Sequence, residues 1–150
     1  ATCAADAASD PCAPRDIGFF NTRIWPHLKH GSAVAGAAGT LPCSNTTLVR
    51  GLSCLSADGV TLTHIRLDNA GLSGTMPTLL GLLPALQWLV IENDAQFRGT
   101  IPSEIGVCTR LERVFVHTCN LSGRVPSELG LLTSVQYVSF HSNPLSGSLP

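Results

Sequence analysis

Residues 62–150 contain the same short pattern four times. The four units begin at Leu62, Leu86, Leu111 and Val135, so their starts lie 24, 25 and 24 residues apart. Each unit has apolar residues at its first, fourth and sixth places and closes with proline, in the segments LSGTMP, FRGTIP, LSGRVP and LSGSLP. A unit of this length cannot bury an apolar face alone, so it has to pack against copies of itself. The repeat therefore predicts a solenoid.

The order of residues within a unit predicts its path. The first, fourth and sixth side chains point inward from a short strand, and stacked units set these strands side by side and parallel. The closing proline fixes φ and cannot donate to a strand ladder, so it ends the second straight side of the coil. The SEIG or SELG run that follows predicts one helical turn, started by serine and ended by glycine. We therefore predict an α/β solenoid, with a parallel sheet on the concave face and short helical turns on the convex face.

This repeat resembles the plant-type extracellular leucine-rich repeat, LxxLxLxxNxLSGxIPxxLGxLxx, of receptor-like kinase ectodomains and secreted inhibitors of pathogen enzymes. The resemblance covers residues 62–150, as three full repeats and one partial repeat, and depends on the LSGxIP and ELGxL motifs. At the place of the family's inward asparagine, the four units carry Ala70, Asp94, Cys119 and Asn143. Only Asn143 fits, with Cys119 a tolerated substitute, so we expect an incomplete ladder of asparagine side chains. The second unit has one extra residue between Asp94 and Phe97, which should bulge outward.

Residues 1–61 do not repeat and are predicted to form an N-terminal cap. A cap is required because the first coil of a solenoid otherwise exposes its apolar end. Cys3 and Cys12 lie close in sequence, so we expect them to pair locally. The resemblance to the family's cap implies a second disulfide, between Cys43 and Cys54.

The remaining two cysteines lie within the repeats. Cys108 takes an inward leucine place, and Cys119 takes the inward asparagine place on the other side of the coil. These places should be too far apart for the Cα separation of about 5.5 Å that a disulfide needs. We predict two buried free thiols, with a bridge as the alternative. A metal or redox role is disfavoured, because buried thiols mostly behave as small apolar groups.

Several features of the sequence indicate an extracellular protein of one domain. Six cysteines in 150 residues favour an oxidising compartment. The sequons at Asn45 and Asn120 are compatible with N-glycosylation, and a first residue Ala1 suggests a mature end left by signal-peptide removal. The net charge of −1 gives no reason to expect nucleic acid or an anionic membrane as a partner. No apolar run approaches the roughly 20 residues that cross a bilayer. We predict a secreted protein at the cell surface or in the cell wall.

The outward places of the predicted strands form the candidate binding surface. The third places carry His64, Trp88, Arg113 and Tyr137, the fifth carry Arg66, Val90, Phe115 and Ser139, and the seventh carry Asp68, Glu92, His117 and His141. Exposed aromatic residues flanked by arginine are typical of binding hot spots, although scattered surface aromatics are the alternative interpretation. The predicted ligand contacts are His64, Arg66, Trp88, Glu92, Arg113, Phe115, His117, Tyr137 and His141.

The seventh places also raise the question of metal binding. Glu92, His117 and His141 fall on successive strands and have the chemistry of a divalent-metal site or of a pH-dependent contact. We favour a solvated polar edge, and predict no metal and no cofactor. No nucleophile elbow, Ser–His–acid set, pair of catalytic carboxylates or phosphate loop occurs in a supporting context. The chain is therefore predicted to be a non-enzyme.

The resemblance implies a recognition module that binds a protein, peptide or glycan on its concave face. Because the sequence stops at Pro150, half way through a unit, we expect either a piece of a longer ectodomain or a scaffold subunit. The scaffold would stack head to tail through the open apolar layer of the last unit. An ice-binding role, known for some plant relatives, is disfavoured, because the array it would use is broken by arginine. That array consists of Thr75, Thr100, Arg124 and Ser148.

Overall fold

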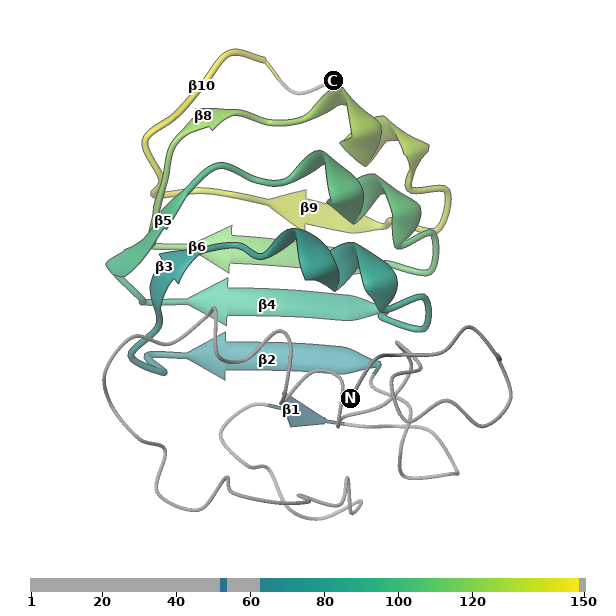
Figure 1. Cartoon of the computed structure of the whole chain (residues 1–150), viewed down its shortest axis with the longest axis horizontal. Helices are drawn as coiled ribbons and strands as arrows, with labels where there is room; N and C mark the ends of the chain where they lie inside the picture. Colours follow the sequence, from purple (N-terminus) through teal and green to yellow (C-terminus); the bar gives the residue numbers. More distant parts are fainter. Residues whose placement is uncertain (1–51, 54–62, 149–150) are drawn as a thin grey trace, which may run out of the picture.

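The computed structural model describes residues 52–53 and 63–148 (Figure 1). Several predictions fall on other parts of the chain and lie outside the described residues. These are the Cys3–Cys12 and Cys43–Cys54 disulfides, the sequon at Asn45, and the cap with its boundary at residue 61, apart from residues 52–53.

The described elements are short strands and 3-10 turns that follow one another in a regular order. In chain order they are β1 (Leu52–Ser53), β2 (His64–Asp68), β3 (Ser73–Thr75), η2 (Thr78–Leu82), β4 (Trp88–Glu92), β5 (Gln96–Gly99), η3 (Ser103–Val107), β6 (Arg113–His117), β7 (Asn120–Leu121), β8 (Gly123–Arg124), η4 (Ser127–Leu131), β9 (Tyr137–Ser139) and β10 (Leu145–Ser146).

The repeats stack into a solenoid with one main sheet of order β1-β2-β4-β6-β9 (Figure 1). Strands β2, β4, β6 and β9 are parallel, and β1 joins β2 antiparallel. Their register aligns the same place of every unit, so His64 pairs with Trp88, Trp88 with Arg113, and Arg113 with Tyr137. The predicted parallel neighbours and columns are therefore confirmed.

The other two sides of each coil follow the predicted path, with one difference. Strands β3, β5 and β7 form a second parallel sheet, the flank sheet, and β8 pairs with β10 in the same way. Each 3-10 turn begins directly after a proline, but no side chain caps it. Serine is the first residue of η3 and η4, as predicted, but the Ser103 hydroxyl donates to the Glu104 carboxylate at 3.2 Å instead of capping the turn.

The glycine of each turn lies inside the turn rather than at its end, which is a second difference from the prediction. Close packing of consecutive turns explains why this residue is glycine. A Cβ on Gly81 would lie 2.6 Å from the Glu104 carbonyl oxygen, and one on Gly106 would lie 2.5 Å from the Glu128 carbonyl oxygen. Such distances are far inside van der Waals contact, so only glycine lets consecutive turns approach. Gly130 has nothing within 4 Å of its Cβ position.

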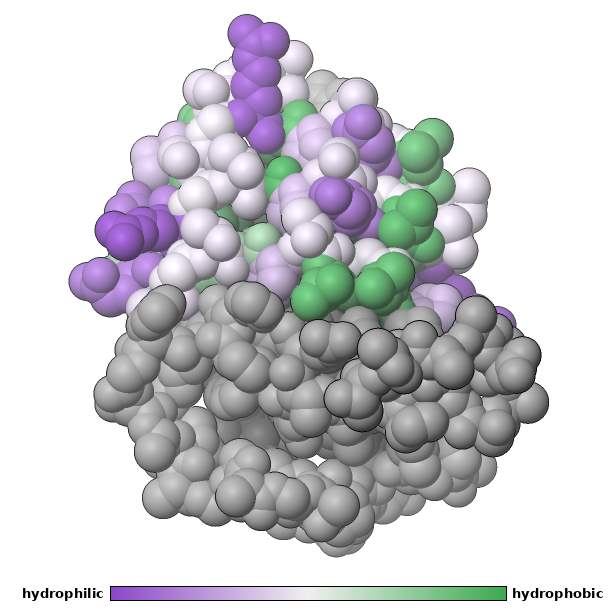
Figure 2. Space-filling view, in the orientation of Figure 1, coloured by the Kyte–Doolittle hydropathy of each residue, from purple (hydrophilic) through white to green (hydrophobic). Residues whose placement is uncertain are grey.

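The inward places of the units form one continuous apolar core. The middle members of the inward trios are almost fully buried, with Ile65, Leu89 and Val114 at most 1% exposed. In the fourth unit the trio is only partly buried and packs against the edge of this core. The convex side differs, because it exposes one apolar residue on each turn (Figure 2). These residues are Leu82, Val107 and Leu131, between 47% and 61% exposed.

The asparagine ladder is more complete than the sequence suggested. Asp94 is 3% exposed, and its carboxylate accepts the backbone N–H of Leu72 at 2.9 Å and that of Ala70 at 3.3 Å. Asn143 accepts the N–H of Leu121 at 3.1 Å in the same way. An aspartate therefore replaces asparagine as the acceptor between coils, and the prediction that only Asn143 fits was wrong.

The extra residue of the second unit lies on the surface, as predicted. Ala95 and Gln96 are exposed, whereas Phe97 is fully buried. The coil thus absorbs the insertion between two anchored positions, the Asp94 side chain and the Phe97 ring.

Both cysteines of the repeats are buried free thiols, which confirms that prediction. The Cys108 thiol donates to the Leu80 carbonyl at 3.3 Å, and the Cys119 thiol donates to the His117 carbonyl at 3.2 Å. Burial raises the pKa of Cys108 to about 11, and it also raises the pKa of Cys119. Both groups therefore stay protonated near neutral pH. Within residues 52–53 and 63–148, no helix has the length and apolar character to span a membrane.

Candidate ligand-binding face

The third places of the main sheet form a stack of aromatic and cationic side chains. The His64 ring meets the Trp88 ring edge-on, with centroids 4.4 Å apart. The Arg113 guanidinium carbon lies 4.3 Å from the Trp88 ring centroid and 5.4 Å from the Tyr137 ring centroid. Each such cation–π contact contributes about 0.5–1 kcal/mol at an exposed site. Arg113 is thus held between two rings, with no ion-pair partner among the described residues.

Exposure increases along this stack from β2 to β9. His64 is 5% exposed, Trp88 and Arg113 are partly exposed, and Tyr137 is 53% exposed. Burial lowers the pKa of His64, with Glu112 opposing and Arg113 adding to the effect. Because His64 is buried and packs edge-on against the Trp88 ring, its predicted role as a direct ligand contact is not carried forward.

The fifth places of the units lie on the face between the third places and the seventh places. Val90 lies on the outward side of β4 but is only 7% exposed. Its strand partners are Arg66, which is exposed, and Phe115, which is partly exposed. The centre of the face is therefore apolar, with an arginine at one side.

The seventh places bring together the predicted carboxylates and imidazoles. His117 Nδ1 lies 3.4 Å from Glu92 Oε1, and the His117 and His141 ring centroids are 3.7 Å apart. Asp68 accepts a hydrogen bond from Asn93 Nδ2 at 2.8 Å. The pKa of His117 is lowered, first by burial and then by His141, while Glu92 acts in the opposite direction. His117 Nε2 is buried without a hydrogen-bond partner.

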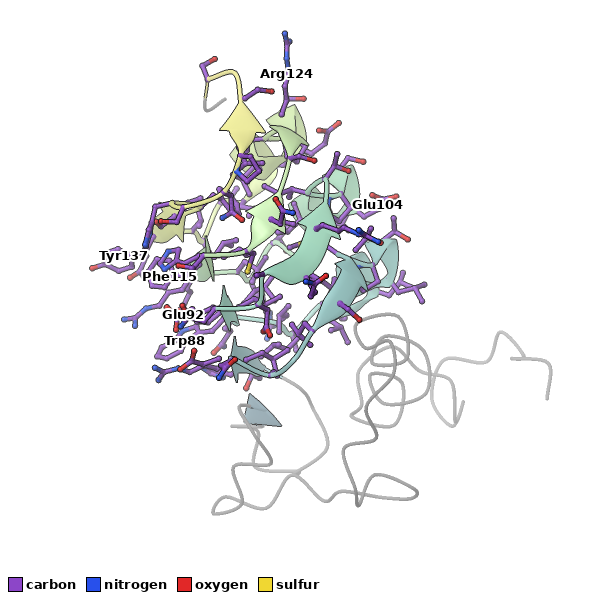
Figure 3. All side chains as sticks on the ribbon, turned by 90° about the vertical axis from the view of Figure 1, so that its left-hand side faces the viewer. Trp88, Glu92, Glu104, Phe115, Arg124 and Tyr137 are labelled. Carbon is purple, nitrogen blue, oxygen red and sulfur yellow. The ribbon has the colours of Figure 1, made fainter. Side chains whose placement is uncertain are left out.

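The concave face is thus chemically divided along its strands. Its third places are aromatic and cationic, and its seventh places are acidic and imidazole-bearing. Figure 3 shows Trp88, Glu92, Phe115 and Tyr137 on one side of the solenoid, away from Arg124 and Glu104. An extended ligand lying across this face would meet both halves.

This solenoid is similar to many solved structures, including the following three. The leucine-rich repeat ectodomain of the receptor kinase SOBIR1 from Arabidopsis thaliana aligns at a TM-score of 0.54 and 22% identity, over 64% of this chain and 55% of that one. A plant ice-binding protein aligns at 0.58 and 26% identity, over 63% of this chain and 30% of that one. The PEPR1–AtPEP1 structure aligns at 0.58 and 25% identity, over 84% of this chain and 18% of that one. This chain has the leucine-rich repeat solenoid fold of these plant proteins.

The leucine-rich repeat chain spans about half of the SOBIR1 ectodomain and smaller parts of the other two structures. No protein-family model matches its sequence, and no curated protein does.

The leucine-rich repeat fold places most of the predicted contacts on one surface. Arg66, Trp88, Glu92, Arg113, Phe115, His117, Tyr137 and His141 all lie on the concave sheet or directly after it, and only His64 is buried. Asn93 was missed by the sequence reasoning, although its φ of +60° favours asparagine and its side chain holds Asp68 in place.

Metal ligation is not supported by the geometry of the seventh places. No group of three or more histidine, cysteine, aspartate or glutamate side chains is placed to hold a metal ion within the described part of the chain. The His117 and His141 rings pack against each other with their planes tilted by 43°.

Proposed function

We propose that the concave face binds an extracellular peptide or protein segment without catalysing a reaction. The observation that carries this proposal is the Trp88–Arg113–Tyr137 stack, which fixes three interface-prone side chains before any ligand arrives. Ordering a long side chain on binding costs about 0.5–1.5 kcal/mol. A preformed stack avoids much of that cost, and Trp, Tyr and Arg are the residues most often found at hot spots.

The charges of the face indicate which ligand would suit it. Arg66 and Arg113 have no acidic partner among the described residues, so each can pair with a carboxylate of the ligand. Asp68 and Glu92 at the other end of the strands would attract a cationic group. An extended segment with an acidic and a basic group on either side of an apolar residue meets these requirements. A glycan is the alternative ligand, since it would also stack on Trp88 and Tyr137.

The similarity to known structures supports the proposal at the level of the fold. One of the similar structures is PEPR1 with AtPEP1, and this chain covers 18% of PEPR1. We accordingly propose a secreted or cell-surface location, which also agrees with the cysteine content of the sequence.

The proposal can be tested with a random linear peptide library displayed on phage and panned against the immobilised full chain. We expect enriched peptides whose capture falls about tenfold or more in Tyr137→Ala and in Arg113→Gln, which corresponds to about 1.4 kcal/mol. Leu131→Ala, an exposed substitution on the convex side, is the matched control and should keep full capture. Peptides that bind all three variants as well as the parent chain would contradict the proposal.

A head-to-tail scaffold is the second candidate, and one observation favours it. A hollow of about 230 Å³ lies at the last described coil, lined by apolar groups of Val125, Val138, Phe140 and Leu145. A second copy seated there would bury them. Sedimentation would then give species well above 15.7 kDa, whose share increases with protein concentration and which are absent in Phe140→Asp. If the chain sediments as a monomer at all concentrations, the scaffold role is excluded and only the recognition role remains.

A further inference from the structure

The sequon Asn120-Leu121-Ser122 is displayed in an outward conformation by the flank sheet. Asn120 and Ser122 are exposed, and Leu121 between them is fully buried. Alternation along a strand produces this arrangement, since successive side chains point to opposite faces. The buried leucine anchors the segment while the acceptor asparagine and the serine hydroxyl face outward together.

The backbone of this sequon is held at three points. Asn120 pairs with Arg98 across the flank sheet, the Ser122 N–H donates to the Gly99 carbonyl at 2.7 Å, and the Leu121 N–H donates to Asn143 Oδ1 at 3.1 Å. The Asn120 carboxamide, by contrast, makes no hydrogen bond in the described part of the chain. Attaching a sugar to it would therefore break no contact of the fold.

Asn143 shows what an unavailable asparagine looks like in the same molecule. Its Nδ2 donates to the carbonyls of Val116 at 2.7 Å and Phe140 at 3.0 Å. Asn143 is followed by proline and leucine, so it is also outside any sequon. Asn120 differs from it in exposure, in hydrogen bonding and in sequence context.

We propose that Asn120 carries an N-linked glycan that covers the flank sheet and leaves the concave face open. The acceptor chemistry is the ordinary one: Asn120 Nδ2 forms a bond to the anomeric carbon of a lipid-pyrophosphate oligosaccharide, the sugar–pyrophosphate bond breaks, and the amide loses one proton to the medium. Surface loops and strands of secreted proteins accept such groups, which are bulky and solubilising.

The position of the glycan determines which sides of the solenoid can meet other molecules. The flank sheet faces the viewer in Figure 3, between the side that carries Trp88 and Tyr137 and the side that carries Glu104. A glycan on β7 extends from that flank, next to exposed Arg98 on β5. The glycan would therefore block binding to the flank sheet. This blocked surface includes the exposed threonines Thr75 and Thr100.

The test is secretion of the full chain from cultured human cells behind a heterologous signal peptide, followed by peptide mass spectrometry. Trypsin separates the two sequons, since residues 114–124 contain Asn120 as their only asparagine and residues 30–50 contain Asn45. We expect the 114–124 peptide to carry glycan mass, and to be recovered with aspartate at position 120 after treatment with peptide N-glycosidase.

Four variants make the assignment specific. Asn120→Gln and Ser122→Ala should abolish glycan on this peptide, whereas Ser122→Thr and Asn45→Gln should retain it, because either hydroxyl residue completes a sequon. A secreted chain with unmodified Asn120 would overturn the proposal. The placement on the flank has its own readout: phage-displayed peptides should be captured equally before and after glycosidase treatment, and a gain in capture on removal would show that the glycan covers the concave face.

Discussion

At the residue scale, each repeat has one left-handed position after its main-sheet strand, directly after it in the first three repeats and three residues after it in the fourth. Asn69, Asn93, Thr118 and Ser142 have φ values of +47°, +60°, +51° and +57°. Asparagine tolerates this region, whereas the branched Cβ of threonine clashes with the following carbonyl. The third repeat therefore carries backbone strain that the first two avoid.

Thr118→Asn should relieve that strain and raise the free energy of unfolding by about 0.5–2 kcal/mol. The measurement is chemical denaturation of the parent chain and the variant at the same pH. Thr133→Asn is the matched control, because Thr133 is also exposed but does not have a positive φ. An equal gain in both variants would show that strain at Thr118 is not the cause.

Asp94 gives a second residue-scale prediction. Asp94→Ala leaves the N–H groups of Leu72 and Ala70 without their acceptor, so it should destabilise the chain by about 1–3 kcal/mol. Asp94→Asn keeps an acceptor and adds the donor that Asn143 uses, so its thermal midpoint should equal or exceed that of the parent. A large loss in the asparagine variant would show that the carboxylate itself is required.

At the element scale, η3 is covered by a following turn, whereas no described turn follows η4, although the two turns have similar sequences. Gly106 in η3 lies against the Glu128 carbonyl of η4, whereas Gly130 in η4 has free space at its Cβ position. Gly106→Ala should therefore destabilise the chain by about 1–3 kcal/mol through overpacking. Gly130→Ala, the same change one repeat later, should be close to neutral. Equal thermal midpoints for the two variants would rule out the packing explanation.

The sheet columns, His64 and Asp94 show what the sequence could and could not predict. The repeat period gave the sheet columns correctly, because a side chain's direction follows from its place in the strand. It could not predict that His64 is buried, since burial also depends on what covers the edge of the sheet. Nor did it reveal that Asp94 replaces asparagine, because motif matching compares residue types, whereas the ladder needs only an acceptor at the right point.

At the scale of the whole molecule, one buried and one partly buried imidazole make stability depend on pH. The pKa values of His64 and His117 are both lowered from 6.5, chiefly by burial. The unfolded chain therefore binds protons more tightly, so stability is full above pH 6.5 and falls as the pH drops through the unfolded value toward the folded ones.

Thermal midpoints should accordingly decrease from about pH 7.5 to about pH 5, a range that includes the ordinary histidine pKa, and His117→Gln should make that decrease smaller. Leu131→Ala, which is remote from both rings, should keep the slope of the parent. A slope that His117→Gln leaves unchanged would show that His117 does not titrate differently on folding.

The layered build has a mechanical consequence. The main contacts between elements join each coil to the next one, through β2 and β4, β4 and β6, β6 and β9, and through successive turns. A force that pulled the two ends of the solenoid apart would act on one interface at a time, so the layers would peel away in sequence, each release lengthening the tether by one unit.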